Sequence, residues 1–307
     1  MSIVAVAGGS GNVGRTIVET LAKSSNYKVI VLGRKVQTIL DNVPCYAVDY
    51  TDVDATATLL SQHEVKVVIS TIQVTDETSS TAEVNLIKAA GKASAVSRFI
   101  ASSWGSLPSE TSPLSIYQKA SEAALRSTTL EWTRFSVGFF MDYYGIPAIK
   151  TYLPPMSFVV DMNSKKAAIP GTGDEPMALT YSYDVARFVS AYLGAPKWEE
   201  LTYVYGEKTT WNAFIKVAEE VTGTQFEVSF DPIEKLARGE VTELPSHKEE
   251  LANSPFPEPF ARQLLAILGS WVVGGQFDIP VDKALNNSFP DIKPMGVREL
   301  LLVRQVS

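Results

Sequence analysis

The sequence predicts an α/β fold, a doubly wound parallel sheet followed by a smaller C-terminal α+β lobe. In residues 1–150, short apolar runs alternate with helical patterns, which is typical of parallel strands joined by crossover helices. The apolar runs lie at 3–7, 28–32, 45–48, 66–70 and 97–101, and the helical patterns lie at 12–24, 52–62 and 78–94. A helix at 115–127 and a strand at 130–135 continue the alternation. Ligands of such sheets bind at the carboxyl ends of the strands, where the strand order reverses.

The composition of the sequence changes after residue 145, where prolines and glycines indicate loops. Beyond these loops the patterns predict a helix at 181–193, a strand at 202–206, a helix at 211–221 capped by Thr210, a strand at 225–230, and helices broken by the PFPEP segment at 255–259. We therefore expect two parts, packed as one structural unit. The larger domain comprises residues 1–150 plus 178–206, and a substrate-binding lobe comprises residues 151–177 plus 207–307.

Composition and charge argue against several classes of protein. The 307 residues include 27 Lys and Arg against 34 Asp and Glu, and the net charge of -7 disfavours a nucleic-acid or anionic-membrane surface. The single cysteine, Cys45, cannot form an intrachain disulfide and suits a reducing compartment. No apolar run approaches the roughly 18 residues of a membrane span, and a strand that begins at residue 3 leaves no room for a signal peptide. A cytoplasmic location is expected.

The two histidines of the chain do not have the spacing of metal ligands, so no metal site is expected. His63 is expected in a surface loop. For His247 we favour a solvated helix start over a lid residue that faces a substrate.

A glycine-rich turn joins the first strand to the first helix. Gly8, Gly11 and Gly14 are separated by two residues each, in the segment GGSGNVG. Glycines let the backbone turn tightly and approach a phosphate, and a helix N-terminus offers unpaired N–H groups and a positive dipole end. The segment, with Asn12 and Val13 in the first helical turn, therefore predicts a dinucleotide site. The alternative is a tight turn in a ligand-free domain.

The ends of the next strands predict which dinucleotide binds. A carboxylate after the second strand would select NAD, whereas a basic residue there accommodates the 2′-phosphate of NADP. This strand ends in Arg34 and Lys35, which favours NADP(H) over the alternative of two solvated basic residues. Asp49 after the third strand is placed to approach the adenine edge. Ser70 and Thr71 after the fourth are expected near the pyrophosphate or the adenine-side ribose.

The fifth strand and the helix after it carry the polar groups expected nearest the nicotinamide. The strand ends with Ser102 and Ser103, and the helix contains Tyr117 and Lys119. The Tyr-x-x-x-Lys pair of a short-chain dehydrogenase is absent, because Ser121 stands four residues after Tyr117. Lys119 lies about 200° around the helix from Tyr117, so the two side chains do not share a face. We expect Lys119 to polarise a substrate oxygen or relay a proton.

Taken together, these motifs resemble the NmrA-like and isoflavone-reductase-like group of atypical short-chain dehydrogenase/reductases. The resemblance rests on GGSGNVG, LGRK, ASSWG, the helical Lys119 with Glu122, and LEWTRFSVGFFMDYYG. It covers roughly residues 1–225 and, more loosely, the rest. Two departures bear on Lys119: the spacing from it to LEWT is about one residue shorter than in the plant reductases, and the first glycine pair is Gly8-Gly9.

The resemblance implies a Rossmann domain that prefers NADP(H), with a smaller C-terminal lobe for the substrate. It implies that a lysine matching Lys119 works in place of the usual catalytic tyrosine. The segment Ser102-Ser103-Trp104-Gly105 occupies the place of the Ser-Glu-Phe-Gly segment of the reductase branch. The segment from Phe135 to Phe140 corresponds to the stretch that lines the nicotinamide face, with Phe135 and Val137 expected to contact the cofactor.

Other residues are expected where the substrate would sit. Tyr143 or Tyr144 could donate a proton to a substrate, with simple packing as the alternative. The apolar side chains would fit a hydrophobic, ring-bearing molecule; they are Trp104, Phe139, Phe140 and Met141.

Three functions remain open from the sequence. The first is an NADPH-dependent reductase of a small aromatic or polycyclic, natural-product-like metabolite. The second is an NmrA-type regulator that binds NADP and a partner protein without turnover. The third is an isomerase or rearrangement enzyme that retains NADP but transfers no hydride. The sequence leaves the substrate undetermined, and it is compatible with a monomer or a homodimer.

Overall fold

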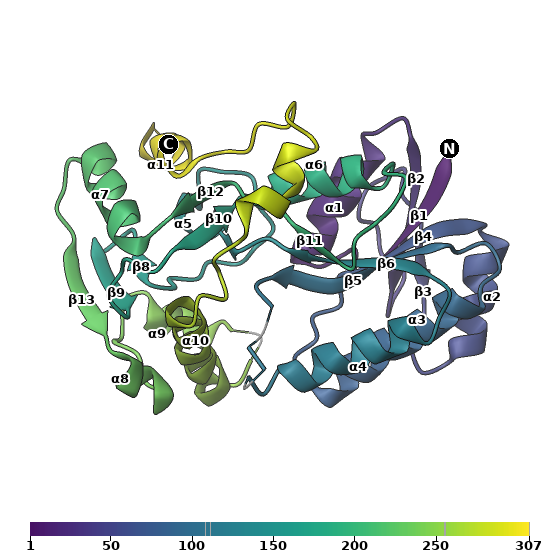
Figure 1. Ribbon diagram of the computed structural model, residues 1–307, viewed down its shortest axis with the longest axis horizontal. Coiled ribbons are helices and arrows are strands. Elements are labelled where there is room, and N and C mark those ends of the chain that lie inside the picture. The colour runs from purple at the N-terminus through teal and green to yellow at the C-terminus, as the bar shows by residue number, and fades with distance from the viewer. Residues whose placement is uncertain (108, 111, 255, 307) are drawn as a thin grey trace. The chain divides into compact units, whose positions relative to one another are not determined.

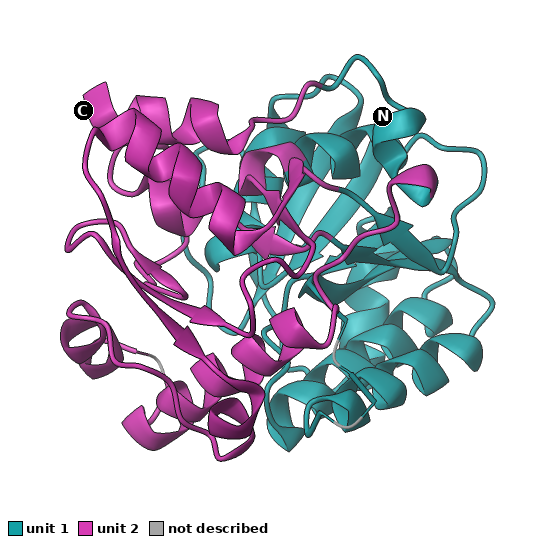
Figure 2. Cartoon of the chain, turned by 60° about the vertical axis from the view of Figure 1, so that its left-hand side comes forward, with its two compact units in different colours: residues 1–136, 185–204, 283–292 teal, residues 137–184, 205–282, 293–307 magenta. Residues whose placement is uncertain are grey.

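The computed structural model describes residues 1–107, 109–110, 112–254 and 256–306, which form two compact units (Figure 2). Unit 1 comprises residues 1–136, 185–204 and 283–292, and unit 2 comprises residues 137–184, 205–282 and 293–307. None of the helices in the described part of the chain is long and apolar enough to cross a membrane.

Unit 1 is built on a seven-stranded parallel sheet in the order β11-β6-β5-β4-β1-β2-β3. Its strands are β1 (Ser2–Ala7), β2 (Tyr27–Gly33), β3 (Cys45–Ala47), β4 (Val65–Ser70), β5 (Arg98–Gly105), β6 (Glu131–Ser136) and β11 (Leu201–Tyr203). The chain first builds outward from β1 to β3, then returns to β4 on the other side of β1. The strand order therefore reverses between β1 and β4, as in dinucleotide-binding α/β sheets.

Helices cover both faces of this sheet (Figure 1). They are α1 (Asn12–Ala22), α2 (Val53–Gln62), α3 (Glu77–Lys92), α4 (Ser115–Arg126) and α6 (Ser182–Tyr192), with a 3-10 turn at Leu285–Asn287. Figure 1 shows α2, α3 and α4 along one face and α1 along the other. The central strands are buried on both faces, and this is why they read as continuous apolar runs rather than alternating ones.

Unit 2 contains two small sheets, in the orders β12-β10-β7 and β13-β9-β8. Their strands are β7 (Phe139–Phe140), β8 (Val160–Asp161), β9 (Lys166–Pro170), β10 (Met177–Thr180), β12 (Glu207–Thr209) and β13 (Glu227–Asp231). The helices of the unit are α5 (Asp142–Gly145), α7 (Trp211–Thr222), α8 (Ile233–Ala237), α9 (His247–Ala252), α10 (Glu258–Val273) and α11 (Val297–Val306), with a 3-10 turn at Val281–Lys283 at its border.

The α/β prediction is confirmed, including the Rossmann-type sheet and the helix capped by Thr210, whose side chain accepts from the N–H of Ala213. Strands β9 and β10 were not expected, because Pro170 and Pro176 at their ends read as loop signals. They form through pairing with strands far away in sequence, β13 and β12. The first segment of unit 1 ends at residue 136, because β7 pairs with β10 inside unit 2. Of the expected helix break at 255–259, residue 255 lies outside the described residues.

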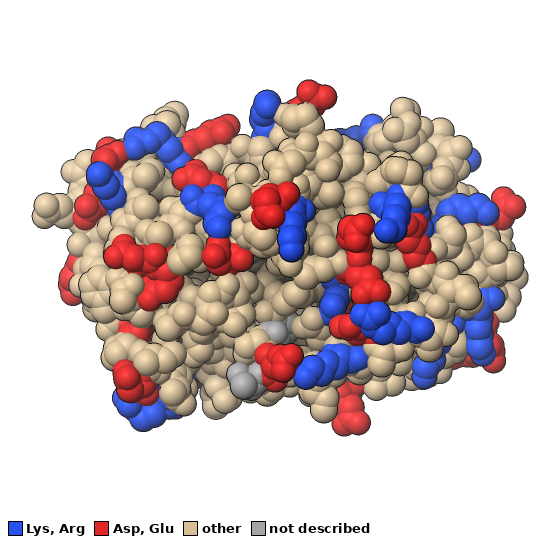
Figure 3. Space-filling model, in the orientation of Figure 1, with Lys and Arg blue, Asp and Glu red and all other residues tan. Residues whose placement is uncertain are grey.

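Charged side chains of both signs lie interspersed on the face shown in Figure 3. This face carries no broad field of one sign of the kind that binds nucleic acid.

Candidate functional site

The glycine-rich turn connects β1 to α1 at the carboxyl edge of the sheet. Gly8 has a positive φ of 76° and donates its N–H to the carbonyl of Leu32 at 3.0 Å. Gly11 closes the turn by donating to the carbonyl of Gly8 at 2.9 Å. Gly11 is also the residue before α1, so no side chain caps the helix, and the first turn contains no acidic residue. The helix N-terminus thus offers its N–H groups and positive dipole end to an anion.

The absence of a side chain at Gly14 is a packing requirement of the same turn. A Cβ on Gly14 would lie 2.4 Å from the Gly8 carbonyl oxygen and 2.4 Å from Oγ1 of Thr71. Thr71 is itself fixed, because its Oγ1 donates to the carbonyl of Ala7 at 2.7 Å. The turn is therefore a tight backbone cradle of the kind that fits a pyrophosphate, with Asn12 and Val13 in the first turn of the helix.

The strand ends beside this turn carry the residues predicted to meet the adenosine half of a dinucleotide. Arg34 and Lys35 follow β2 and are exposed. Asp49 is also exposed, and Thr51 donates both its N–H and its hydroxyl to one carboxylate oxygen, which lowers the pKa of Asp49. Ser70 ends β4 and is fully buried. The structure thus brings the predicted adenosine-side residues to one edge of unit 1, and their roles remain predictions.

The end of β5 is held by a residue that belongs to none of the sequence motifs. Glu83 on α3 is 1% exposed, and its carboxylate accepts from the N–H of Ser102 at 2.7 Å and from the hydroxyl of Ser121 at 2.8 Å. Burial raises the pKa of Glu83, and these two hydrogen bonds oppose that effect. The only sequence signal was an acidic residue on the apolar side of the 78–94 helical pattern.

Ser103 and Trp104 follow in the same strand end and are half-buried. The indole N–H of Trp104 donates to the carbonyl of Ser70 at 2.9 Å, and its ring stacks on Phe135 with a centroid separation of 5.6 Å. Phe135 is fully buried and also contacts the ring of Tyr192 edge-on. Trp104 and Phe135 therefore form an aromatic contact within unit 1, at the carboxyl ends of β5 and β6.

Helix α4 has a defined orientation about its axis, because Ser121 faces the buried Glu83. Tyr117 lies four residues before Ser121, on the same side of the helix, and is half-buried. Lys119 is about 200° around the helix from Ser121 and is exposed. The predicted catalytic role of Lys119 therefore depends on the reach of a long, flexible side chain from the outer face of the helix.

The remaining predicted residues belong to unit 2. Val137 is fully buried, and its carbonyl accepts the hydroxyl of Thr180 at 2.6 Å. Tyr144 is also fully buried and donates its hydroxyl to the carbonyl of Phe158 at 2.7 Å. Burial raises the pKa of both Tyr143 and Tyr144. For Tyr144 this geometry favours the packing alternative.

The predicted substrate-contacting side chains of unit 2 are buried: Phe139, Phe140 and Met141 are 6%, 7% and 0% exposed. The ring of Phe139 lies 4.9 Å from that of Phe158 and 5.8 Å from that of Phe277, measured between centroids. Phe139 therefore packs in an aromatic cluster of unit 2, and the contact of all three residues with a substrate remains a prediction.

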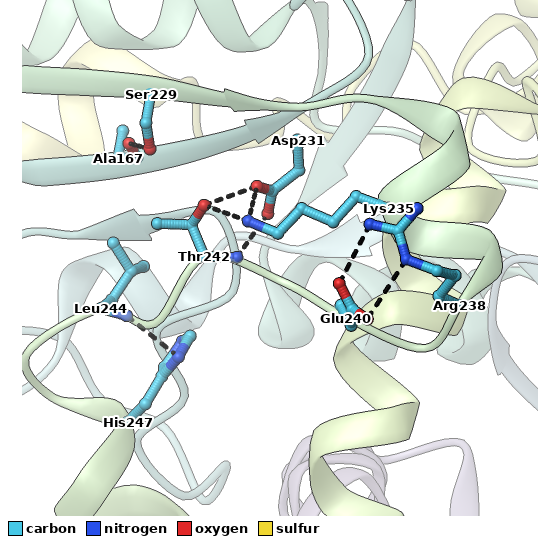
Figure 4. Close-up of polar contacts among 9 residues, drawn as sticks. All are labelled: Ala167, Ser229, Asp231, Lys235, Arg238, Glu240, Thr242, Leu244 and His247. Atoms are coloured by element: carbon cyan, nitrogen blue, oxygen red, sulfur yellow. Dashed lines mark hydrogen bonds and ion pairs between the residues drawn. The ribbon is translucent and has the colours of Figure 1, made fainter.

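The expectation of a solvated helix start at His247 is wrong. His247 begins α9 but is only 4% exposed, because its ring is held between two backbone groups. Nδ1 accepts from the N–H of Leu244 at 3.2 Å (Figure 4). Nε2 lies 2.9 Å from the carbonyl oxygen of Ser157. This pairing assigns the neutral tautomer with the proton on Nε2. His247 therefore has a structural role within unit 2.

Comparison with known proteins agrees with this architecture. The model of the NmrA-like family matches residues 1–272. The chain is 31% identical to "Oxidoreductase swnN" of Metarhizium robertsii, over 97% of this chain and 96% of the relative, and 30% identical to "Oxidoreductase BOA1" of Botryotinia fuckeliana, over 95% of each. A solved structure of AtPrR2 with NADP+ and (+)pinoresinol has a TM-score of 0.72 at 19% identity, covering 99% of this chain and 98% of the other. The likeness to the AtPrR2 structure shows the fold alone. The chain therefore belongs to the NmrA-like family, and its curated relatives are oxidoreductases.

Proposed function

We propose that the protein is an NADP(H)-dependent reductase of a small aromatic or polycyclic metabolite. The observation that carries the proposal is the β1–α1 turn with basic residues after β2. The tight packing around Gly14 and the uncapped start of α1 suit a pyrophosphate, and Arg34 with Lys35 suits a 2′-phosphate. The names of the curated relatives support a redox enzyme.

In this proposal the residues of the chain have the following roles. The N–H groups of Asn12, Val13 and Gly14 bind the pyrophosphate, and Arg34 binds the 2′-phosphate as a bidentate donor. When bound, the nicotinamide supplies a hydride to a carbon made electrophilic by a conjugated or polarised double bond. The indole of Trp104 and the hydroxyl of Ser103 lie on the β5 end expected to face that ring. The pinoresinol bound by a structural neighbour supports an aromatic substrate class.

The proton transfer is assigned to α4, and two side chains compete for it. Lys119 is the residue predicted from the sequence, and its long side chain extends from the exposed side of the helix. Tyr117 is the competitor, because it lies on the side of the helix that faces Glu83. If Lys119 is the proton relay, Lys119→Ala lowers kcat at least a hundredfold while Tyr117→Phe has little effect. The reverse result assigns the proton to Tyr117, and full turnover in both variants removes α4 from the chemistry.

A regulator that binds NADP(H) without turnover is the second candidate. It is favoured by the burial of Phe139, Phe140 and Met141, which were expected to line a substrate pocket. Such a protein would contact a partner protein, and it would bind NADPH without oxidising it.

The test is the loss of NADPH absorbance on addition of aromatic compounds with a conjugated double bond, with NADPH affinity measured in parallel by fluorescence. Oxidation of NADPH coupled to a reduced product supports the reductase. Conversion of the compound without NADPH loss supports the isomerase. Tight binding without any conversion across the panel supports the regulator, and no affinity for NADPH refutes the cofactor assignment.

A further inference from the structure

Glu83 is a buried acid whose position is defined by its hydrogen bonds. It lies on α3, 1% exposed, and its two carboxylate oxygens face two different elements of unit 1. Oε1 accepts from the backbone N–H of Ser102 on β5 at 2.7 Å, and Oε2 accepts from the hydroxyl of Ser121 on α4 at 2.8 Å. A buried carboxylate with both oxygens paired is costly to disrupt, because removing the acceptor leaves its donors unsatisfied.

The hydrogen bond between Glu83 and Ser102 lies where β5 loses its backbone pairing with the neighbouring strands. Pairing with β4 ends at Ile100, and regular pairing with β6 ends at Ala101 before resuming at Gly105. The N–H of Ser102 is therefore bound by a side chain at the point where the ladder of backbone bonds is interrupted. The Ser102 hydroxyl is also fixed, since it donates to the carbonyl of Ile72 at 2.6 Å.

The contact with Ser121 sets the orientation of α4. Each helical residue adds about 100° of rotation, so fixing Ser121 against α3 also fixes where Tyr117 and Lys119 point. The carboxylate of Glu83 thus holds the end of β5, where the backbone pairing is interrupted, and also fixes the rotation of α4 about its axis. Both elements lie on the β4–β5–β6 side of the point where the strand order reverses, whereas Arg34 and the glycine turn lie at β1 and β2.

We propose that Glu83 is a positioning residue that shapes the nicotinamide half of the dinucleotide site, by holding residues 102–105 and the rotation of α4 without touching the cofactor. This inference rests on the proposed NADP(H) site. The two halves of a dinucleotide contact opposite sides of the reversal point, so loss of Glu83 should affect their binding differently. Loss of Glu83 should weaken binding of the whole dinucleotide but not of its adenosine half.

The experiment compares NADPH with adenosine 2′,5′-bisphosphate, which contains only the adenosine half, by calorimetric titration of the full chain. In Glu83→Ala, the Kd for NADPH is expected to rise at least tenfold, while the Kd for adenosine 2′,5′-bisphosphate stays within twofold of wild type. Glu83→Gln should restore NADPH affinity to within threefold, because its amide oxygen can accept from Ser102 and its amide group can still bond to Ser121. A role confined to folding would change both affinities equally.

Ser80→Ala is the matched control, since Ser80 is a buried residue one turn away on the same helix. It should leave both Kd values unchanged. If Glu83→Ala does not fold, Glu83→Asp replaces it, because a side chain shorter by about 1.5 Å cannot reach both donors. The inference is overturned if the folded Ala or Asp variant binds NADPH with wild-type affinity. It is also overturned if the Kd values for both ligands rise by the same factor. Failure of the proposed cofactor appears separately, as absent NADPH binding by the wild-type protein.

Discussion

The substitution Gly14→Ala is expected to damage both the stability of unit 1 and its affinity for NADPH. The added Cβ would lie 2.4 Å from the Gly8 carbonyl oxygen and from Oγ1 of Thr71, whereas ordinary contacts begin at 3.4 Å. The turn must therefore open by roughly 1 Å, against a backbone carbonyl and a threonine hydroxyl already bonded to Ala7. Overpacking of this kind costs about 1 to 3 kcal/mol, equivalent to a fall of about 2 to 12 °C in the melting temperature.

The same shift moves the N–H groups at the start of α1, so the Kd for NADPH should rise at least tenfold. Differential scanning fluorimetry and fluorescence titration measure the two effects. Gly223→Ala is the control, because Gly223 has a φ of 65° and no atom within 4 Å of its added Cβ. It should cost about 1 to 2 kcal/mol from backbone strain alone and leave NADPH affinity unchanged. If Gly14→Ala binds NADPH with wild-type affinity, the proposal that this turn binds the pyrophosphate is refuted.

Three further changes test other parts of the structure. Arg34→Glu should raise the Kd for NADPH at least tenfold with little effect on NADH, because the lost contact is to the 2′-phosphate; equal changes for both cofactors would contradict this. Asp231→Ala should lower the stability of unit 2 by about 3 to 5 kcal/mol, since the buried carboxylate accepts from Nζ of Lys235 at 2.7 Å and from the N–H and hydroxyl of Thr242 (Figure 4). Thermal unfolding checks this, and an unchanged melting temperature would contradict it. Asp142→Asn should reduce the pH dependence of stability. Burial raises the pKa of Asp142, so the folded protein retains this proton to higher pH than the unfolded chain, and its contribution to stability falls as pH rises from about 3.9 through the folded pKa. Urea unfolding at a series of pH values measures the slope, and identical slopes in wild type and variant would exclude Asp142 as its source.

The sequence predicted unit 1 well because its signals are local. An apolar run, a glycine turn and an amphipathic helix each arise within a few residues, so β1, the turn and α1 could be placed from residues 1–24 alone. The basic residues at the end of β2 could be placed in the same way, because a strand end is a local feature. These features together identified the family and the Rossmann-type sheet before any contact was known.

Only the tertiary structure decided what depends on distant pairing. Strands β9 and β10 looked like loops because their flanking prolines dominate the local pattern, yet each is completed by a strand far along the chain. The sequence around His247 is typical of a solvated helix start, yet the imidazole ring lies between two backbone groups. The acceptors that fix Ser102 and Ser121 belong to Glu83, which is 19 and 38 residues away in sequence. Burial and hydrogen-bond partners come from residues that periodicity does not connect, so the glycine turn could be read from the sequence, and the orientation of α4 beside it could not.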